Sequence, residues 1–244
     1  MSFTLIDVSH TIEHGMITYK GLPPPVISDY LSRDASRTLY DPGTEFHIGK
    51  LEMVANTGTY LDSPFHRYAD GNDLSGLDLR SLANLDGVVV RHVGAAEREL
   101  ERARSPGLIT SANIFPLAED RRITSATLAG LDVKGRAVLF YTGWDIRWRT
   151  EDYSNGNHPF LTTDAAEYLA SAGAALVGID SYNIDDTADG GRPAHSILLA
   201  HGIPIVEHLC GLRDLPETGF RFFAVPVKVK QFGTFPVRAF AIVP

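Results

Sequence analysis

The densest group of chemically capable side chains lies between residues 56 and 66, in the run Asn-Thr-Gly-Thr-Tyr-Leu-Asp-Ser-Pro-Phe-His. This run places the carboxyl group of Asp62 and the imidazole of His66 four residues apart, with Pro64 between them. Glycine and proline favour a turn, and a turn can direct both side chains into one pocket. By spacing alone, the pair is more simply explained as a turn-capping aspartate and a loop histidine. The pair therefore indicates a reactive site only in combination with other residues.

His195 and Glu207 form a second pair, and the elements expected between them make it more informative. Proline in a first turn and Gly202 as a stop predict a helix from about 193 to 201, followed by a strand from 203 to 207. From His195 the helix advances about 9 Å. The strand returns roughly 13 Å. Both side chains are therefore expected at the same end of this unit.

The position of Glu207 also bears on its role. It closes the apolar run Ile-Pro-Ile-Val, and burying a carboxylate there is costly unless it meets a cation or a hydrogen-bond donor. The alternative interpretation places His195 in solvent at the start of a helix and Glu207 in water at the end of a strand. Spacing leaves both interpretations open.

Around these residues the sequence predicts one α/β domain with a central sheet and flanking helices. Valine-rich apolar runs at 87–93, 137–141 and 175–179 are typical of strands buried on both faces. Further strands are expected at 3–8, 46–54, 220–229 and 237–243, and helices at 95–104, 125–129 and from 162 or 163 to a stop at Gly173. Residues from about 10 to 45, which contain Gly15, Gly21 and three consecutive prolines, are expected to form an irregular N-terminal arm.

Composition limits the partners and the kind of site. The chain has 244 residues, with 30 acidic against 22 basic, and its formal charge of −8 opposes binding to nucleic acid and to anionic membranes. We therefore expect a small-molecule substrate. No apolar run approaches the roughly 20 residues of a membrane span, and the start lacks a signal-peptide pattern, so we expect a cytoplasmic protein. Cys210 is the only cysteine, which excludes an internal disulfide and a thiolate cluster.

Several ordered motifs resemble those of the cyclase family of kynurenine formamidases and isatin-hydrolase-like metal-dependent hydrolases. The run 56–66 is similar to the family signature H-x-G-T-H-x-D-x-P-x-H, and His195 with Glu207 resembles a later pair of metal ligands. The similarity continues through residues 142–144, 177–180, Asp185, 202–207 and 236–238. The resemblance implies a swivelling β/β/α fold with a central mixed sheet, in a single domain covering residues 1–244. It also implies a homo-oligomer, a dimer or a tetramer.

The signature differs from the family pattern at two positions. Asn56 and Tyr60 stand where the family has histidines, and those histidines and the aspartate hold one metal ion in its kynurenine formamidases. The resemblance implies that the other ligand set survives here, as Asp62, His195 and Glu207. It therefore predicts one divalent ion, zinc or manganese, bound by oxygen and imidazole ligands.

The implied activity is hydrolysis of a small amide, lactam, lactone or formamide, acting on a carbon–nitrogen bond other than a peptide bond. A bound ion would polarise the carbonyl group and lower the pKa of a water molecule. His66, which is not needed as a ligand in this scheme, would act as general acid and base. Tyr19, Asn56 and Tyr60 are expected to contact the substrate, Tyr19 because it stands about where the family places a substrate-stacking tryptophan.

Two other functions fit the residues less well. A catalytically silent small-molecule-binding protein would keep the fold and the pocket without metal chemistry, and metal content would distinguish it. A metal-free thiol hydrolase would use Cys210 with His208.

Overall fold

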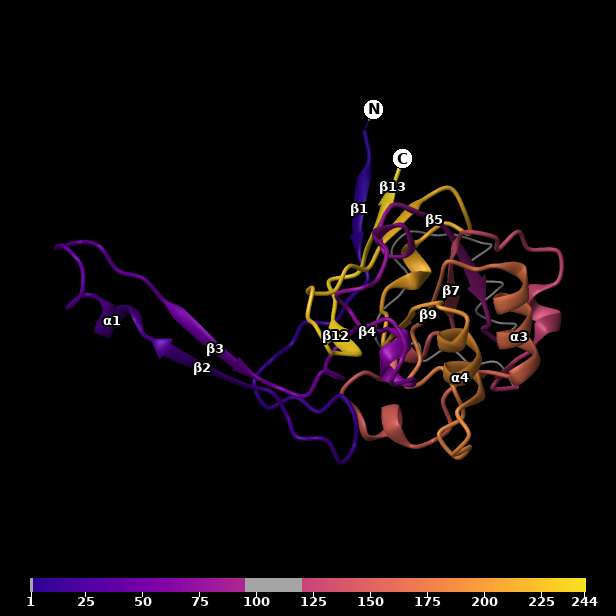
Figure 1. Ribbon diagram of the computed structural model, residues 1–244, viewed down its shortest axis with the longest axis horizontal. Helices are drawn as coiled ribbons and strands as arrows, with labels where there is room; N and C mark the ends of the chain where they lie inside the picture. The colour runs from indigo at the N-terminus through magenta and orange to yellow at the C-terminus, as the bar shows by residue number, and fades with distance from the viewer. Residues whose placement is uncertain (1, 95–119) are drawn as a thin grey trace.

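A nine-stranded mixed sheet forms the centre of the protein in the computed structural model, which describes residues 2–94 and 120–244 (Figure 1). The strands lie in the order β1 (Thr4–Asp7), β13 (Phe240–Val243), β11 (Arg221–Phe223), β5 (Leu85–Arg91), β7 (Ala137–Tyr141), β9 (Leu176–Ile179), β10 (Ile205–Glu207), β4 (Tyr60–Asp62) and β12 (Thr234–Pro236). The four strands β5, β7, β9 and β10 are mutually parallel, and their neighbours on both sides are antiparallel. The predicted central mixed sheet is confirmed.

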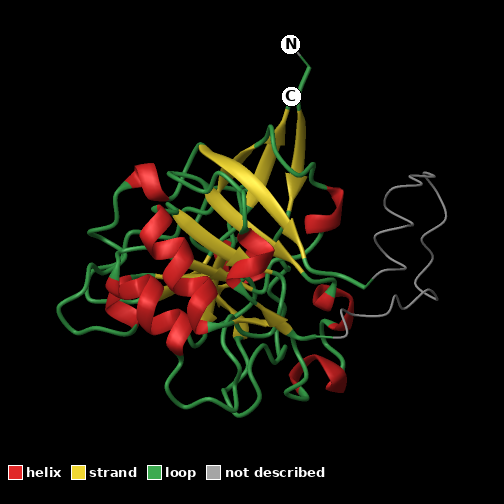
Figure 2. Ribbon diagram, turned by 90° about the vertical axis from the view of Figure 1, so that its right-hand side faces the viewer, coloured by secondary structure: helices red, strands yellow, loops and turns green. Residues whose placement is uncertain are grey.

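The parallel strands are apolar throughout because both of their faces are covered. Helices α3 (Thr163–Ala172) and α4 (Pro193–Ala200) lie over one face (Figure 2), where Phe140 of β7 belongs to the same core as Leu169 and Leu198. The preceding residue on β7, Leu139, points to the opposite core with Phe222. This alternation follows from the two-residue period of a strand and explains the valine-rich runs in the sequence.

The predicted helices flanking the sheet are largely confirmed. α3 starts after Thr162 and ends at Ala172, before Gly173, whose φ of 78° is the left-handed conformation that favours glycine at a helix end. α4 ends at Ala200, close to the predicted stop. The helix expected at 125–129 is a short 3₁₀ turn, and the helix expected at 95–104 lies outside the described residues. The 3₁₀ turns are Pro64–His66, Leu79–Ser81, Ser125–Leu128, Trp144–Arg147, Glu151–Ser154 and Leu212–Asp214.

The C-terminal strands differ from the prediction. The strand expected at 220–229 ends at Phe223, since Pro226 lacks the N–H group that would continue the ladder. The last strand begins at Phe240 rather than at 237. The expected turn around Asp62 is also wrong, because residues 60–62 form strand β4 between β10 and β12.

The N-terminal arm is more regular than predicted. Strand β2 (Val26–Leu31) pairs antiparallel with β3 (Ile48–Glu52), and the one-turn helix α1 (Arg33–Ser36) lies in the connection between them. The glycines and prolines before Val26 do interrupt regular structure, as expected. Beyond them the prediction is wrong, because β2 is stabilised by a partner strand further along the chain. The ribbon extends far from the body (Figure 1).

Two small features complete the described structure. β6 (Arg122–Ile123) pairs with β8 (Phe160–Leu161) in a separate two-stranded sheet. Within residues 2–94 and 120–244, no helix is long and apolar enough to cross a membrane.

Candidate metal centre

Strand register places three predicted site residues, together with Thr234, on one face of the sheet. Tyr60 of β4 lies opposite Glu207 of β10, and Asp62 lies opposite Thr234 of β12. Side chains directly opposite each other, and those two residues apart, share a face. All four therefore project toward the face that α4 covers. The first turn of α4 carries His195, so the helix places an imidazole over these side chains.

His195 and Glu207 meet as the helix-and-strand geometry predicts, and Asp62 lies beside them. The Nε2 atom of His195 lies 3.7 Å from Oδ2 of Asp62 and 3.7 Å from Oε1 of Glu207. All three side chains are buried, Asp62 completely. These separations are too long for hydrogen bonds. Two ligand atoms that each lie about 2.1 Å from one metal ion, at a tetrahedral angle, are about 3.4 Å apart. The separations of the side-chain atoms here are close to that value.

One atom of this group is left without a partner. The buried Oδ2 atom of Asp62 accepts no hydrogen bond within the described part of the chain. A buried carboxylate oxygen without a donor is costly, and a cation removes that cost. The oxygen and imidazole donors, their spacing and the unsatisfied oxygen therefore fit a divalent metal ion.

Asp185 fixes the orientation of His195. Its carboxylate accepts hydrogen bonds from the backbone N–H of Ala194 at 2.6 Å and of His195 at 3.1 Å, at the start of α4. It also accepts from Nδ1 of His195 at 2.6 Å. A proton held on Nδ1 leaves Nε2 free to face the two other carboxylates. This arrangement of a carboxylate behind an imidazole is the usual support of a metal-binding histidine.

The electrostatics of the group favour a positive charge. Burial lowers the pKa of His195, but Glu207, Asp185 and Asp62 outweigh that effect and raise its pKa to about 10. Burial raises the pKa of Glu207 to about 7, opposed by His195 and by the hydrogen bond from Tyr60, and reinforced by Asp62. When no metal is bound, a proton on His195 therefore compensates these buried carboxylates.

Glu207 is held by several donors of the protein. The hydroxyl of Tyr60 donates to Oε2 at 2.6 Å, and the backbone N–H of Ile184 donates to Oε1 at 2.7 Å. The side-chain amide of Asn183 lies 3.5 Å from Oε2. Tyr60, at one of the two altered signature positions, therefore contacts a predicted ligand. Neither Asn183 nor Ile184 was identified from the sequence, because their contact with Glu207 depends on how the loop after β9 folds.

The other two predicted substrate contacts are placed differently. The hydroxyl of Tyr19 accepts a hydrogen bond from the amide of Asn183, and its ring lies 4.5 Å from that of Tyr182. Tyr19 is therefore linked to Glu207 through the side chain of Asn183. Asn56 is partly buried on the turn before β4, and its side-chain amide makes no hydrogen bond among the described residues. The roles of both residues toward a substrate stay predictions.

His66 borders the group on its exposed side. It lies in the 3₁₀ turn Pro64–His66, and its side chain is 36% exposed. Its Nδ1 atom lies 2.8 Å from the hydroxyl oxygen of Thr234, which donates a hydrogen bond to Oδ1 of Asp62. A hydroxyl has one proton, so beside an ionised Asp62 the oxygen of Thr234 must accept from Nδ1–H of His66. This leaves the lone pair of His66 on Nε2.

A close backbone contact gives Thr234 its position. A Cβ atom on Gly233 would lie 2.6 Å from both Cα and N of His66, so a larger residue does not fit there. The carbonyl of Gly233 also accepts a hydrogen bond from the N–H of Ser63 at 2.7 Å. Glycine thus lets β12 pack directly on the turn that carries His66. Thr234 was not identified from the sequence, where 172 residues separate it from Asp62.

His66 can take one of two roles at this site. Ligand atoms of Asp62, His66 and His195 all lie within 4.8 Å of one another, which makes them a possible three-ligand set. The predicted set contains Glu207 in place of His66. Both sets share Asp62 and His195, and they differ in whether His66 binds the metal or stays free for proton transfer.

The thiol alternative has little physical support. Burial, followed by the charges of Asp145 and Asp7, raises the pKa of Cys210 to about 12, so the thiol stays protonated at neutral pH. His208 is fully buried, and its Nδ1 atom lies 2.7 Å from the hydroxyl of Tyr153. Burial also lowers the pKa of His208 well below its usual value, which keeps the ring neutral.

Comparison with known proteins agrees with this geometry. Residues 6–186 match the Cyclase family model. The chain belongs to the Cyclase family. A kynurenine formamidase from Bacillus cytotoxicus is 26% identical over 239 residues, covering 96% of this chain and 95% of the relative.

Solved structures of this family share the fold. A structure described as a predicted metal-dependent hydrolase from Bacillus stearothermophilus is 26% identical, with a TM-score of 0.69 and full coverage of both chains. Isatin hydrolase A from Labrenzia aggregata is 20% identical, with a TM-score of 0.74 over 99% of this chain and 94% of that one. At this lower identity the second likeness concerns the fold alone. The predicted cyclase fold is confirmed.

Proposed function

We propose that this cyclase-family protein is a metal-dependent hydrolase that cleaves a carbon–nitrogen bond in a small amide, formamide or lactam, or the corresponding bond of a lactone. One observation carries the proposal: the unpartnered, buried Oδ2 atom of Asp62 faces Nε2 of His195 at 3.7 Å. Relatives named kynurenine formamidase support the substrate class.

In this proposal Asp62, His195 and Glu207 hold one divalent ion, zinc or manganese. The ion supplies Lewis acidity for the carbonyl oxygen and for activation of water. Asp185 keeps Nε2 of His195 directed toward the two carboxylates, and it does so through the 2.6 Å contact with Nδ1. Tyr60 and Ile184 keep the carboxylate of Glu207 facing the same point.

His66 acts as the general base and then the general acid. Its Nδ1–H is held by Thr234, so Nε2 accepts a proton from water as the water oxygen attacks the carbonyl carbon. When the carbon–nitrogen bond breaks, the same proton passes from Nε2 to the leaving nitrogen. Exposure of the side chain lets His66 meet a substrate that enters from solvent.

A second candidate function is a catalytically silent binding protein. It is favoured by the hydroxyl of Tyr60, which binds Glu207 at 2.6 Å, and by Asn56 at the other altered signature position. Such a protein would bind a small molecule but would not catalyse its conversion.

We also propose that the protein is cytoplasmic and that it forms a homo-oligomer, a dimer or a tetramer. The acidic net charge disfavours nucleic acid and anionic membranes as partners.

The test is metal content and turnover measured on the same preparation. Protein purified without chelator is analysed for zinc and manganese, then assayed against a formamide such as N-formylkynurenine and against the lactam isatin. We expect about one ion per chain, and hydrolysis that is lost after chelation and restored by the metal. Metal-loaded protein that hydrolyses neither substrate class would favour the binding protein. Chelated protein with undiminished turnover would contradict the metal-dependent mechanism.

A further inference from the structure

Two arginine side chains at the edge of the site form no ion pair within the described part of the chain, and neither has a role in the proposed reaction. They are Arg67, which follows His66, and Arg192, which lies three residues before His195. We propose that both arginines determine specificity, by binding a carboxylate group of the substrate while its amide or formamide group meets the metal centre. The inference rests on the proposed function and narrows the substrate to a carboxylate-bearing amide or formamide.

Arg67 links the turn that carries His66 to helix α4. Its Nε atom donates a hydrogen bond to Oγ of Ser196 at 3.3 Å, and Ser196 directly follows His195. The hydroxyl of Tyr68 donates to the carbonyl of Ser196 at 2.8 Å, and the guanidinium carbon of Arg67 lies 5.2 Å from the centre of the Tyr68 ring. These contacts hold the guanidinium group between the elements that carry the two histidines. Its two terminal nitrogens donate no hydrogen bond to a described residue.

Arg192 lies at the other end of the same chain of contacts. Oγ of Ser196 donates to the carbonyl of Gly191 at 3.2 Å, so one serine and one glycine connect Arg67 with Arg192. The Nη1 atom of Arg192 donates to the backbone carbonyl of Asp186 at 2.8 Å. Its other guanidinium nitrogens make no hydrogen bond among residues 2–94 and 120–244. Both arginines therefore keep N–H donors for a ligand.

The backbone and the charge of Arg192 both point to a role toward the substrate. Its φ of 46° and ψ of 61° are left-handed, a conformation that glycine would adopt at lower cost and that is frequent at functional sites. Burial raises the pKa of the hydroxyl groups of Tyr19 and Tyr182, as does the charge of Glu207, and the positive charge of Arg192 opposes this rise. The guanidinium group thus acts on Tyr19, which is predicted to contact the substrate.

The acidic side chains near Arg192 have other partners. The Oδ1 atoms of Asp186 and Asp189 each accept a hydrogen bond from the backbone N–H two residues further along the chain, at 3.0 Å and 2.8 Å. Oδ2 of Asp186 lies 4.0 Å from Nη2 of Arg121. A guanidinium group presents its N–H donors in a plane that matches the two oxygens of a carboxylate. The free donors of Arg67 and Arg192 therefore suit a carboxylate from outside the chain.

The charges of the metal centre explain why an anionic substrate needs these two cations. Asp62, Asp185 and Glu207 are three buried carboxylates, and one divalent ion does not neutralise them fully. An anion at close range is repelled unless positive charge lies beside it. The chain as a whole is acidic, with a formal charge of −8, so its surface in general does not attract an anion either. The two guanidinium groups supply the positive charge at the place where the substrate enters.

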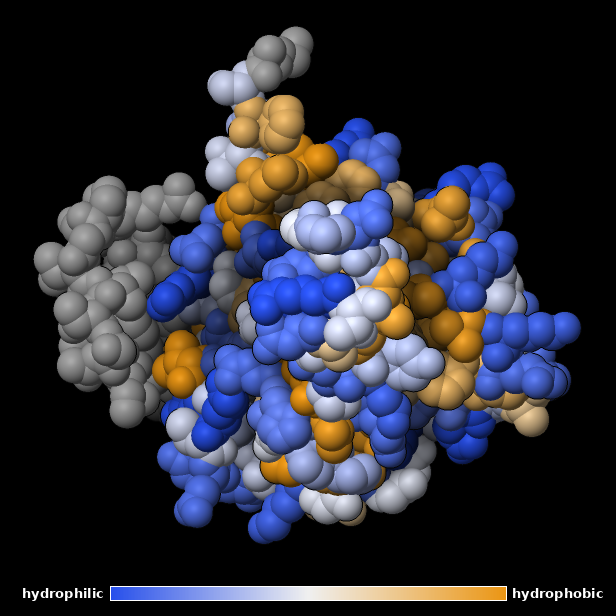
Figure 3. All heavy atoms as spheres, turned by 90° about the vertical axis from the view of Figure 1, so that its left-hand side faces the viewer, coloured by the Kyte–Doolittle hydropathy of each residue, from blue (hydrophilic) through white to orange (hydrophobic). Residues whose placement is uncertain are grey.

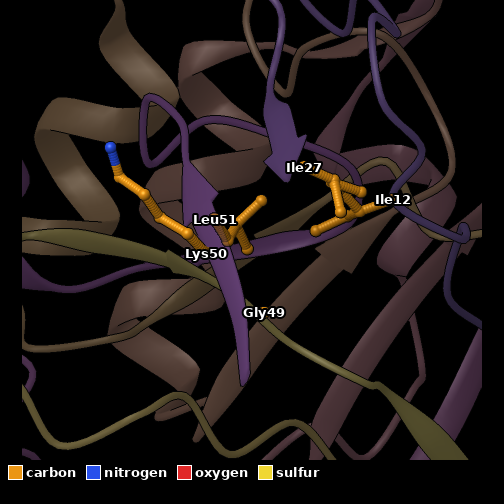
Figure 4. Close-up of a pocket in the computed structure, with 5 residues that line it drawn as sticks. All are labelled: Ile12, Ile27, Gly49, Lys50 and Leu51. Atoms are coloured by element: carbon orange, nitrogen blue, oxygen red, sulfur yellow. The ribbon is translucent and has the colours of Figure 1, made fainter. Parts of the chain in front are cut away.

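The arm offers no comparable site for an anion. A hollow of about 320 Å³ at its base is lined by Ile12, Ile27, Gly49, Lys50 and Leu51. The three large apolar side chains of this hollow point toward one another, while Lys50 points away (Figure 4). Arg37 on the arm is paired with Glu45 at 2.6 Å, and charged and apolar groups are interspersed on the face that Figure 3 shows. The arm therefore does not concentrate unpaired positive charge as the edge of the site does.

The test compares two ligands of the same shape, anthranilate and its neutral amide anthranilamide. Binding is measured by calorimetry with the full-length protein as purified. We expect the wild type to bind anthranilate about 10- to 100-fold more tightly, the range of one hydrogen bond to a charged group. The double variant Arg67→Gln, Arg192→Gln should lose most of this preference. Arg67→Lys with Arg192→Lys keeps the charge but not the planar pair of donors, so it should retain part of the preference.

A control variant and a single variant keep the result interpretable. Arg80 is 91% exposed on the body and lies 2.7 Å from Asp78, and Arg80→Gln should keep the preference of the wild type. Arg67→Gln leaves the start of α4 unchanged and should by itself reduce the preference by about threefold or more. Equal binding of the two ligands by the wild type would overturn the carboxylate site. A preference that survives in the double glutamine variant would also overturn it, because another group would then bind the carboxylate.

Kinetics separate this inference from the proposed reaction. N-formylanthranilate and formanilide carry the same formamide group, and only the first has a carboxylate. We expect the wild-type kcat/KM to favour N-formylanthranilate, mainly through KM, and the double glutamine variant to lose that preference. Hydrolysis of both compounds with equal kcat/KM would overturn the carboxylate site and leave the hydrolase. Binding of anthranilate that depends on both arginines, without hydrolysis of either formamide, would support the carboxylate site and overturn formamide hydrolysis.

Discussion

Glu207 and His66 flank the same pair, Asp62 and His195, but their surroundings are opposite. Glu207 is buried at the end of β10 and is held by Tyr60 and Ile184. His66 is partly exposed, and its side chain is hydrogen-bonded through Nδ1 to the hydroxyl of Thr234. A carboxylate fixed on both oxygens suits a charge that must stay in place. An imidazole with its second nitrogen at the solvent edge suits a proton that must move.

Replacing His66 tests its role in proton transfer and has the largest expected effect. His66→Ala should keep the bound metal, because Asp62, His195 and Glu207 remain, and it should lower kcat by roughly two to four powers of ten, the usual size of general acid–base catalysis. Elemental analysis and steady-state kinetics are measured on one preparation. Loss of the metal would instead assign His66 to the alternative ligand set with Asp62 and His195.

Replacing Asp185 tests the support behind the shared histidine. Asp185→Asn keeps the size of the side chain but removes the charge that holds Nδ1–H of His195. We expect metal affinity to fall by about 10- to 100-fold, as is typical for a residue behind a metal ligand. Metal titration checks this. Exposed Asp152 gives a matched control, since Asp152→Asn lies in the turn Glu151–Ser154 and should bind metal like the wild type.

Thr234 tests whether a hydroxyl sets the orientation of His66. Thr234→Val keeps the shape and removes the hydroxyl with its hydrogen bonds to Asp62 and His66. We expect kcat to fall by about tenfold, because the bond that orients His66 is worth roughly 1–1.5 kcal/mol. Thr234→Ser restores the hydroxyl and should recover most of the rate. Nitrogen NMR of the imidazole should show the Nδ1–H form in the wild type, and Thr234→Val should lose that preference. Equal rates for the two variants would contradict this role.

Cys210 should have the smallest effect. Since burial raises its pKa to about 12, the reactive thiolate forms only at strongly alkaline pH in the folded protein. Alkylation at pH 8 should therefore be slow in the native protein and fast after unfolding, where the pKa returns to about 8.5. Cys210→Ser should keep the wild-type turnover. Rapid alkylation of Cys210 in the folded protein, with loss of activity, would support a thiol mechanism.

The parts of the site that follow from local pattern could be predicted from the sequence. Helix and strand lengths between His195 and Glu207 were enough to place both side chains at one end, because each element has a fixed rise per residue. The valine-rich apolar runs likewise predicted strands of the central sheet that are buried on both faces. Helix ends at Gly173 and near Gly202 were also marked by residue type alone.

The remaining contacts depend on pairings between distant segments. Thr234 reaches Asp62 only because β12 pairs with β4 in one particular register. Tyr60 reaches Glu207 through the register of β4 with β10. The regular arm likewise depends on the pairing of β2 with β3. The sequence pattern of one strand specifies neither its partner strand nor the register of the pairing. The position of the Tyr60 hydroxyl therefore could not be predicted from the sequence.

The metal response of Glu207→Gln tests the shared site most directly. The amide nearly preserves the shape of the side chain and removes the charge that offsets a cation. Binding to the folded state raises apparent stability, by about 2.7 kcal/mol when the free metal is 100 times its Kd. For a chain of this size that corresponds to a rise in Tm of roughly 5–10 °C.

Thermal melting is measured for wild type, Glu207→Gln and the control Glu217→Gln, each with and without added zinc or manganese. Glu217 is exposed and lies outside the site, so the control should respond like the wild type. We expect Tm to rise with metal in the wild type and in the control, and we expect Glu207→Gln to lose that rise. An identical metal response in all three proteins would contradict a site shared by Asp62, His195 and Glu207.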